Sequence, residues 1–328
     1  MTFMAERTYL AALREGLAME MRRDARVLVL GEDVAEGGPF GATKDLVTEF
    51  GPRRVVDTPI SEGTVMGIAT GMAQAGLRPV FEVMFIDFLT LAIDQLANQA
   101  AKARYMSGGQ LSCPLVVRTA AGAGRRYGAQ HSQSLEAWLL HLPGVKVAVP
   151  ATAADAAGLL MSAIRDDDPV VVVEHKILYY RKEEVAEIAP VPLGRAAVRR
   201  PGRDVTIVAT ARTVHEALAA ADDLARDGIE AEVIDPRTLV PLDLDTIVGS
   251  VRRTRACLVA HEAPLRGGIG AELAALVQEH AIDQLDAAVA RLGAPDAPVP
   301  AAPALEDAYI VGHDRIATAV RGLIGRPA

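Results

Sequence analysis

The chain has 328 residues, of which 50% are hydrophobic and only 4% aromatic, and its formal net charge at pH 7 is −8. This length predicts two domains, and this hydrophobicity excludes a disordered chain. Basic residues are scattered and outnumbered by acidic ones, which excludes a surface for nucleic acid or for an anionic membrane.

The sequence also bears on where the protein works. It contains no run of about 18 apolar residues, so no membrane span is predicted. The first ten residues, MTFMAERTYL, lack the pattern of a signal peptide, and Arg is much commoner than Lys, so we expect a bacterial cytoplasmic protein. Cys113 and Cys257 stand far apart and outside any metal-binding spacing, which predicts two reduced thiols in apolar strands.

Strand-like and helix-like segments alternate along the first part of the chain. Strands are predicted at 27–30, 54–56, 79–83, 115–117, 145–149 and 170–173, and helices at 9–22, 61–75, 89–104 and 155–165. Such alternation predicts a parallel sheet with helices on both faces, which is a doubly wound α/β domain.

The alternation stops at a segment bounded by proline and glycine and then resumes. Strands are predicted at 205–209, 231–234, 256–260 and 288–292, and helices at 214–226, 244–251, 269–280 and 314–324. We therefore predict an α/β domain over 1–187, a linker over 188–204, and a second, smaller α/β domain over 205–328.

Three segments are candidates for function, and each has a simpler interpretation. Glu62 follows a strand and opens a helix, so it either favours the positive helix end or faces a ligand at the carboxyl edge of the sheet. His131 lies in the polar loop 128–134, where it is either structural or functional. Phe85 and Phe88 either fill a core or form a platform for a flat heterocycle.

A series of short stretches resembles one enzyme family in the same order along the chain. They are 31–34 (GEDV), 57–62 (DTPISE), 76–80 (GLRPV), 94–95, 98–102 (NQAAK), 104–106, 130–134 (QHSQS), 143–147 (PGVKV), 163–166 (AIRD) and 237–243 (RTLVPLD). The family is the β subunit of the thiamine-diphosphate-dependent decarboxylase component of 2-oxo acid dehydrogenase complexes. The resemblance implies a transketolase-like pyrimidine-binding domain followed by a domain like the transketolase C-terminal domain.

The resemblance implies roles for particular residues. Glu62 would hydrogen-bond the aminopyrimidine ring of thiamine diphosphate, so that the cofactor's exocyclic nitrogen acts as a base toward its thiazolium carbon. Phe88, or otherwise Phe85, would stack on that ring, and His131 would serve acyl transfer to a lipoyl group. Further residues would contact the cofactor or lie between paired active sites, namely Ile60, Met84 and Glu32.

The resemblance also implies bound ions and partners. Oxygens of Leu115, Ala163, Ile164, Asp166 and Asp168 would hold a structural potassium ion, although 166–168 could equally be a solvated turn. The cofactor and its Mg²⁺ would be gripped mainly by an α subunit, because no Gly-Asp-Gly motif occurs here. Two α and two β subunits would assemble and dock to a dihydrolipoyl acyltransferase core with its lipoyl domain.

Some positions depart from the family pattern, and the substrate stays open. Thr64 stands where Gly or Ala is common, the loop 37–40 is one residue short, and Pro236 replaces an apolar residue. Gln130 and the stretch 136–138 are more similar to pyruvate and acetoin members than to branched-chain ones. The alternatives are an acetoin or branched-chain dehydrogenase subunit, half of a split transketolase-type enzyme, or a non-catalytic assembly subunit.

Overall fold

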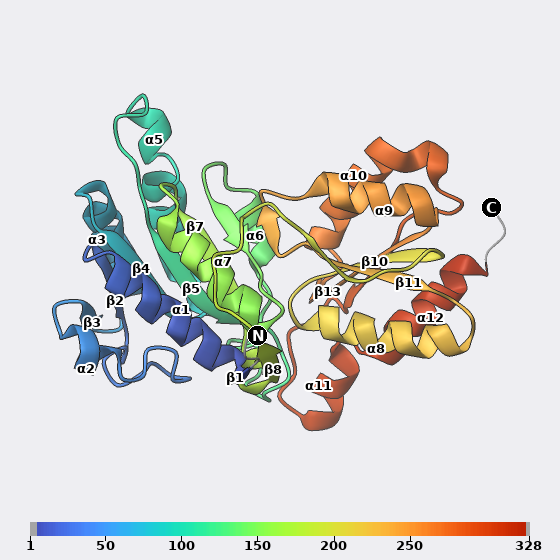
Figure 1. Ribbon diagram of the computed structural model, residues 1–328, viewed down its shortest axis with the longest axis horizontal. Helices are drawn as coiled ribbons and strands as arrows, with labels where there is room; N and C mark the ends of the chain where they lie inside the picture. Colours follow the sequence, from blue (N-terminus) through green and yellow to red (C-terminus); the bar gives the residue numbers. More distant parts are fainter. Residues whose placement is uncertain (1–4, 326–328) are drawn as a thin grey trace. The chain divides into compact units, whose positions relative to one another are not determined.

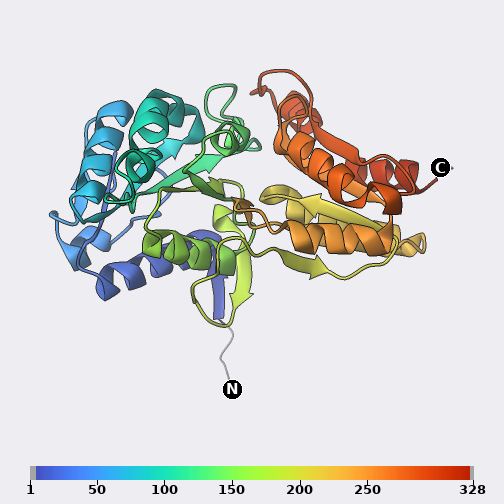
Figure 2. The same ribbon diagram turned by 90° about the horizontal axis from the view of Figure 1, so that it is seen from above.

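The computed structural model describes residues 5–325, which form two compact units (Figure 1, Figure 2). Unit 1 comprises the chain up to Ala121 together with Trp138–Leu193. Unit 2 comprises Gly122–Ala137 together with the chain from Gly194 onward. The junction after Leu193 falls inside the expected linker, whereas sequence reasoning did not anticipate that 122–137 fold with unit 2.

Unit 1 contains a sheet of parallel strands whose apolar runs are buried. The strand order is β6 (Lys146–Ala148), β7 (Val170–His175), β5 (Val116–Ala121), β4 (Arg78–Phe85), β2 (Val27–Gly31) and β3 (Val55–Asp57). Every residue of β2, β5 and β7 is buried, as expected for strands covered on both faces. A separate antiparallel ribbon pairs β1 (Ala5–Thr8) with β8 (Lys182–Val185).

Helices cover both faces of this sheet. Helices α1 (Tyr9–Arg23) and α7 (Ala153–Arg165) lie against one face, and α3 (Glu62–Gln74) and α4 (Ile86–Asp94) against the other (Figure 1, Figure 2). Gly16 allows α1 to approach α7 closely, because a Cβ at this position would lie 3.1 Å from the Cβ of Ala157. Shorter elements of unit 1 are α2 (Leu46–Phe50) and the 3₁₀ turn η2 (Leu178–Tyr180). Helix α6 (Glu136–Leu140) begins in unit 2 and ends in unit 1.

The prediction of one continuous helix over 89–104 was wrong. After α4 the backbone widens into a π-helical turn, η1 (Gln95–Ala100), and then forms the short helix α5 (Ala103–Met106). The wider turn is visible in the bond from the N–H of Ala101 to the carbonyl of Leu96, five residues earlier. Apolar spacing could not reveal this turn, because the residues on either side keep a helical pattern.

Unit 2 repeats the layered design with a smaller sheet. Its strand order is β14 (Ala290–Ala294), β13 (Cys257–Pro264), β10 (Val205–Ala209), β11 (Ala231–Asp235) and the antiparallel edge strand β9 (Ala197–Arg200). Helices α8 (Arg212–Arg226) and α12 (His313–Ile324) lie on one face, and α9 (Leu244–Thr254) and α10 (Ile269–Ala281) on the other (Figure 1). The remaining elements are β12 (Thr238–Val240), the 3₁₀ turn η3 (Ile282–Gln284) and α11 (Pro303–Tyr309).

Both units are therefore layered α/β structures with largely parallel sheets, which confirms the predicted fold class. Both cysteines are free and buried, as expected, but only Cys257 lies in a strand, β13, whereas Cys113 lies in the segment before β5. No helix among the described residues is long and apolar enough to cross a membrane.

Candidate functional site

A small cleft opens at the carboxyl ends of β2, β3 and β4 in unit 1. Its lining includes Glu32, which follows β2, and Ser61 and Glu62, which follow β3. Glu82 and Met84 of β4 complete the wall. Ligands of open α/β sheets bind at this edge, outside the carboxyl ends of the strands. The structure thus brings together three residues singled out from the sequence: Glu32, Glu62 and Met84.

Glu62 is a largely buried carboxylate for which the described part of the chain supplies no hydrogen-bond donor. Its exposed fraction is 9%, and among residues 5–325 no group hydrogen-bonds or ion-pairs with it. It lies in the first turn of α3, at the positive end of the helix dipole. Ser61 is the N-cap residue of this helix, but its side chain makes no capping hydrogen bond. A buried acceptor without a donor is costly unless a ligand supplies one.

Glu32 is the second carboxylate of the cleft. Burial raises its pKa above the usual range, and the nearby negative charges of Glu62 and Asp33 add to the rise. Gly31, just before it, has a φ of 154°, and a Cβ there would lie 2.7 Å from the carbonyl oxygen of Glu82. The glycine therefore lets β2 pass close to β4 as it delivers Glu32 to the cleft.

The two candidate phenylalanines differ in environment. Phe85 is buried in a row of rings, with centroids 5.7 Å from Phe40 and 5.7 Å from Phe88 in edge-to-face geometry. The ammonium of the fully buried Lys176 lies 5.7 Å from the Phe85 ring centroid. Phe88 is only half-buried, so of the two rings it is the more accessible to a ligand. Ile60 is 80% exposed beside the cleft residues Pro59 and Ser61.

Sequence reasoning missed a buried ion network beneath the cleft. Arg118 on β5 donates from Nη1 to Glu82 on β4 at 2.5 Å, and from Nε and Nη2 to both oxygens of Glu174 on β7 at 2.8 Å. The hydroxyl of Tyr179 also donates to Glu174, at 2.8 Å. Burial raises the pKa of Glu82, and the Arg118 charge opposes that rise. The signal was present in the sequence as single charges inside otherwise apolar strands.

His131 lies in unit 2, on the loop Gly122–Ala137, and is half-buried. Its backbone N–H donates to the carbonyl of Gly128 at 3.4 Å. Glu62 belongs to unit 1, so these two candidates are carried by different units. This bond places His131 in a backbone turn of unit 2.

The five oxygen-bearing residues expected to hold potassium all lie in unit 1 and already accept bonds from the protein. Arg78 Nη1 donates to the carbonyls of Ile164 and Asp166, both at 2.9 Å. Lys146 pairs with the Asp166 carboxylate at 2.7 Å, and Arg104 with Asp168 at 2.6 Å. The carbonyls of Leu115 and Ala163 accept from the N–H groups of Val170 and Asp166. Each carbonyl keeps a second lone pair, so these contacts leave cation ligation possible.

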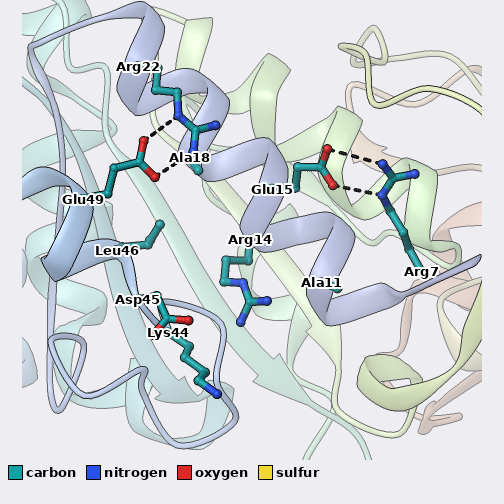
Figure 3. A pocket seen from close by; sticks show the side chains of 10 residues that line it. All are labelled: Arg7, Ala11, Arg14, Glu15, Ala18, Arg22, Lys44, Asp45, Leu46 and Glu49. Atoms are coloured by element: carbon teal, nitrogen blue, oxygen red, sulfur yellow. Dashed lines mark hydrogen bonds and ion pairs between the residues drawn. The ribbon is translucent and has the colours of Figure 1, made fainter. Parts of the chain in front are cut away.

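A larger pocket lies elsewhere on unit 1, between α1 and the 44–49 segment (Figure 3). Its cavity volume is about 280 Å³. Two ion pairs cross its lining, Arg7 with Glu15 and Arg22 with Glu49. The pocket holds none of the residues singled out above, and its mixture of paired charges points to no particular chemistry.

One group in unit 2 has the residue types of a metal site. His313, Asp314 and Asp223 present ligand atoms within 4.8 Å of one another. Asp223 is already paired with Arg226 at 2.9 Å, and Asp314 is largely exposed. We therefore assign no metal to this group.

Comparison with known families agrees with the two-unit structure. The chain matches the family described as transketolase, pyrimidine binding domain, over residues 5–182 and the family described as transketolase, C-terminal domain, over residues 194–316. A solved chain described as "Split gene transketolase, inactive beta4 tetramer" is similar to it with a TM-score of 0.82 and 25% identity, covering 98% of this chain and 99% of that one. The protein is therefore a transketolase-like chain.

Relatives with higher sequence identity show to which family of transketolase-like chains this protein belongs. The acetoin:2,6-dichlorophenolindophenol oxidoreductase subunit beta of Bacillus subtilis is 46% identical, covering 97% of both chains. The pyruvate dehydrogenase E1 component subunit beta of Rickettsia felis is 45% identical, covering 94% of this chain and 96% of the relative. The 2-oxoisovalerate dehydrogenase subunit beta of Bacillus subtilis is 42% identical, covering 98% and 99%. The chain belongs to the family of β subunits of 2-oxo acid and acetoin dehydrogenases.

Proposed function

We propose that this chain is the β subunit of a thiamine-diphosphate-dependent pyruvate dehydrogenase in the bacterial cytoplasm, and that it is active only with an α subunit. The complex would decarboxylate pyruvate and reductively acetylate the lipoyl group of a dihydrolipoyl acyltransferase. The observation that carries the proposal is the Glu62 carboxylate, which is largely buried at a sheet-edge cleft without a donor from the described part of the chain.

The residue types that line the cleft suit the aminopyrimidine half of thiamine diphosphate. A protonated ring nitrogen would supply the donor that Glu62 lacks, and the half-buried Phe88 offers a face for stacking. Met84 and the exposed Ile60 provide apolar contacts beside it. When bound, the cofactor supplies a thiazolium carbon that adds to the 2-oxo carbon and accepts the electron pair released as CO₂ departs.

The chain's own residues would orient the cofactor and hold protons. Glu62, at the positive end of α3, would accept a hydrogen bond from the protonated pyrimidine ring nitrogen and so tune the basicity of the neighbouring exocyclic nitrogen. Burial and the charge of Glu62 raise the pKa of Glu32, so this carboxyl would take up a proton beside the cofactor more readily than an exposed carboxyl. His131 would orient the lipoyl group or transfer a proton during acyl transfer.

Two features support the need for a partner subunit. The sequence lacks a Gly-Asp-Gly motif, so the diphosphate and its Mg²⁺ would be held by the α subunit. Large apolar side chains on α3, α4, α5 and the turn before α3 are exposed, which is typical of surfaces that another chain covers. They are Ile60, Ile68, Leu91, Tyr105 and Met106, with exposed fractions of 48% to 88%. We infer two α and two β subunits, docked to the acyltransferase core, with a potassium ion at the 163–168 segment.

Acetoin is the rival substrate. The acetoin and pyruvate relatives are 46% and 45% identical, so overall identity does not separate them. The residues Gln130 and 136–138 favour both over branched-chain substrates. Pyruvate is our choice because several relatives with similar identity are pyruvate dehydrogenase subunits.

Co-expression with its α partner tests the proposal. The complex, supplied with thiamine diphosphate and Mg²⁺, should release CO₂ from pyruvate faster than from 3-methyl-2-oxobutanoate, and acetoin cleavage should be slower still. Glu62→Gln should assemble normally but lose about 100-fold or more of the decarboxylation rate, the range expected for a general acid–base group. Glu36→Gln, which removes an exposed carboxylate of unit 1, is the matched control and should behave as the parent.

Equal activity of Glu62→Gln and the parent would refute the proposed role and favour a non-catalytic assembly subunit. Preference for acetoin would keep the mechanism and replace the substrate. Activity of the β chain alone would contradict the proposed need for an α subunit.

A further inference from the structure

The loop that carries His131 is fastened to unit 2. Its base closes where the N–H of Gly122 donates to the carbonyl of Gln133 at 3.0 Å. Ala123 is fully buried in a small apolar cluster with residues from distant parts of unit 2, namely Ala294, Val299 and Tyr309. The loop therefore folds with unit 2, although the chain segments just before and just after it belong to unit 1.

Glu306 on α11 holds the first part of this loop. Its carboxylate accepts from the N–H of Gly124 at 2.8 Å, from the N–H of Arg126 at 3.2 Å, and from Arg126 Nη1 at 2.6 Å. The residue is fully buried, with an exposed fraction of 0%. Gly124 and Arg126 have φ values of 103° and 63°. Left-handed turns of this kind aim nearby N–H groups at one anion.

A second buried carboxylate completes the attachment. Glu262 on β13 is 7% exposed and accepts from the N–H of Ala123. Its other oxygen lies 3.4 Å from Arg212 Nη1 on α8. The N–H groups of residues 123, 124 and 126 are therefore held by two carboxylates on separate elements of unit 2. We call Glu262 and Glu306 the loop clasp.

The clasp is a costly way to satisfy backbone donors. Neutral carbonyls or water could accept the same bonds, whereas burying a carboxylate carries a desolvation penalty that only strong, well-aimed donors offset. Charged acceptors make shorter and stronger hydrogen bonds, so they define the loop conformation more tightly. The segment held in this way, 123–126, ends five residues before His131.

We propose that Glu306 is a positioning residue for His131, which it serves by fixing the 124–126 turn of the same loop. This inference rests on the proposed function, because it assigns His131 to the transfer of the acyl group to the lipoyl group. Decarboxylation itself depends on the cleft in unit 1, so loss of the clasp should separate the two half-reactions.

The test compares Glu306→Gln with Asp307→Asn in the reconstituted complex. Asp307 is an exposed neighbour on the same helix that pairs with Arg126 Nη2, so its substitution removes one charge and leaves the buried clasp intact. Acetylation of the lipoyl domain and pyruvate-dependent reduction of 2,6-dichlorophenolindophenol are measured separately. Hydrogen exchange of the backbone reports directly on the loop.

Glu306→Gln should slow lipoyl acetylation by about 10-fold to 100-fold, the loss expected when a reacting group is misplaced by about 1 Å. Dye reduction should change by less than threefold, and exchange should accelerate within 122–134. His131→Gln should show the same split, and the double variant should lose no more than the worse single one. Asp307→Asn should match the parent.

Unchanged loop exchange in Glu306→Gln would overturn the proposal, as would losses that multiply in the double variant. If Glu306→Gln fails to assemble, Arg126→Met removes one donor to Glu306 and keeps the backbone bonds. It should show the same split at smaller size, and parent-like acetylation with parent-like loop exchange would overturn the proposal. Absence of CO₂ release by the parent complex would refute the proposed function instead, and loop exchange would still decide whether the clasp exists.

Discussion

Glu136 gives a stability prediction whose sign and size follow from its surroundings. It begins α6 on the far side of the His131 loop and is 6% exposed. Burial raises its pKa from the usual 4.5 to about 7; its own backbone N–H opposes the rise and the charge of Glu262 adds to it. In the unfolded chain the carboxyl would ionise near its usual pKa. The folded state therefore binds more protons between pH 4.5 and 7, and stability falls as the pH rises through that window.

The size follows from the shift. A difference of about 2.5 pKa units corresponds to roughly 3 kcal/mol once the pH exceeds about 7.5, and to roughly 2 kcal/mol at pH 6. Glu136→Gln keeps the shape of the side chain and removes the ionisation. It should stabilise the protein by up to about 3 kcal/mol at pH 8 and by less than about 1 kcal/mol at pH 4.5.

Urea unfolding of the full-length chain at several values between pH 4.5 and 8 measures this difference. Glu279→Gln, an exposed substitution of the same kind in unit 2, is the control and should track the parent at every pH. The reasoning is refuted if the stability curves of Glu136→Gln and the parent run parallel across the whole range.

Three further predictions concern unit 1 and its surroundings. Arg118→Met leaves two buried carboxylates unpaired and should cost about 3–5 kcal/mol in urea unfolding, with a smaller cost counting against the ion network. Gly144→Ala would place a Cβ 2.1 Å from the carbonyl oxygen of Ala101 at a φ of 99°, so it should destabilise far more than Gly228→Ala, where nothing lies within 4 Å and only about 1 kcal/mol of backbone cost is expected. Thermal unfolding in potassium chloride should occur at a higher temperature than in choline chloride of equal ionic strength. Equal unfolding temperatures in the two salts would contradict the proposed potassium site.

Strongly patterned segments of the fold were predictable from the sequence. The run Val170–Val173 and the segment 27–30 are apolar at every position, and both are buried central strands. The edge strand β9 was missed because its sequence, Ala-Val-Arg-Arg, is half charged. Helix α11 was missed because prolines at 295, 298, 300 and 303 precede or begin it, a pattern typical of a loop. Short edge elements take their structure from neighbours, which local pattern does not record.

The candidate site was predictable where a carboxylate residue comes soon after the end of a predicted strand. Glu62 and Glu32 come after β3 and β2, and strand ends of a parallel sheet share an edge. The clasp was not predictable, because Glu306 meets the His131 loop only through backbone N–H groups some 180 residues earlier in the chain. Backbone donors carry no sequence signal. A single Glu near the end of a proline-rich segment does not stand out.

The exchange of the thiazolium proton of bound thiamine diphosphate with deuterated water tests the role of Glu62 most directly, since it reports activation before any substrate is added. In the complex with the α subunit, Glu62→Gln should slow this exchange by about 100-fold or more while the cofactor remains bound. Equal exchange rates in the parent and Glu62→Gln, at equal cofactor occupancy, would contradict the account.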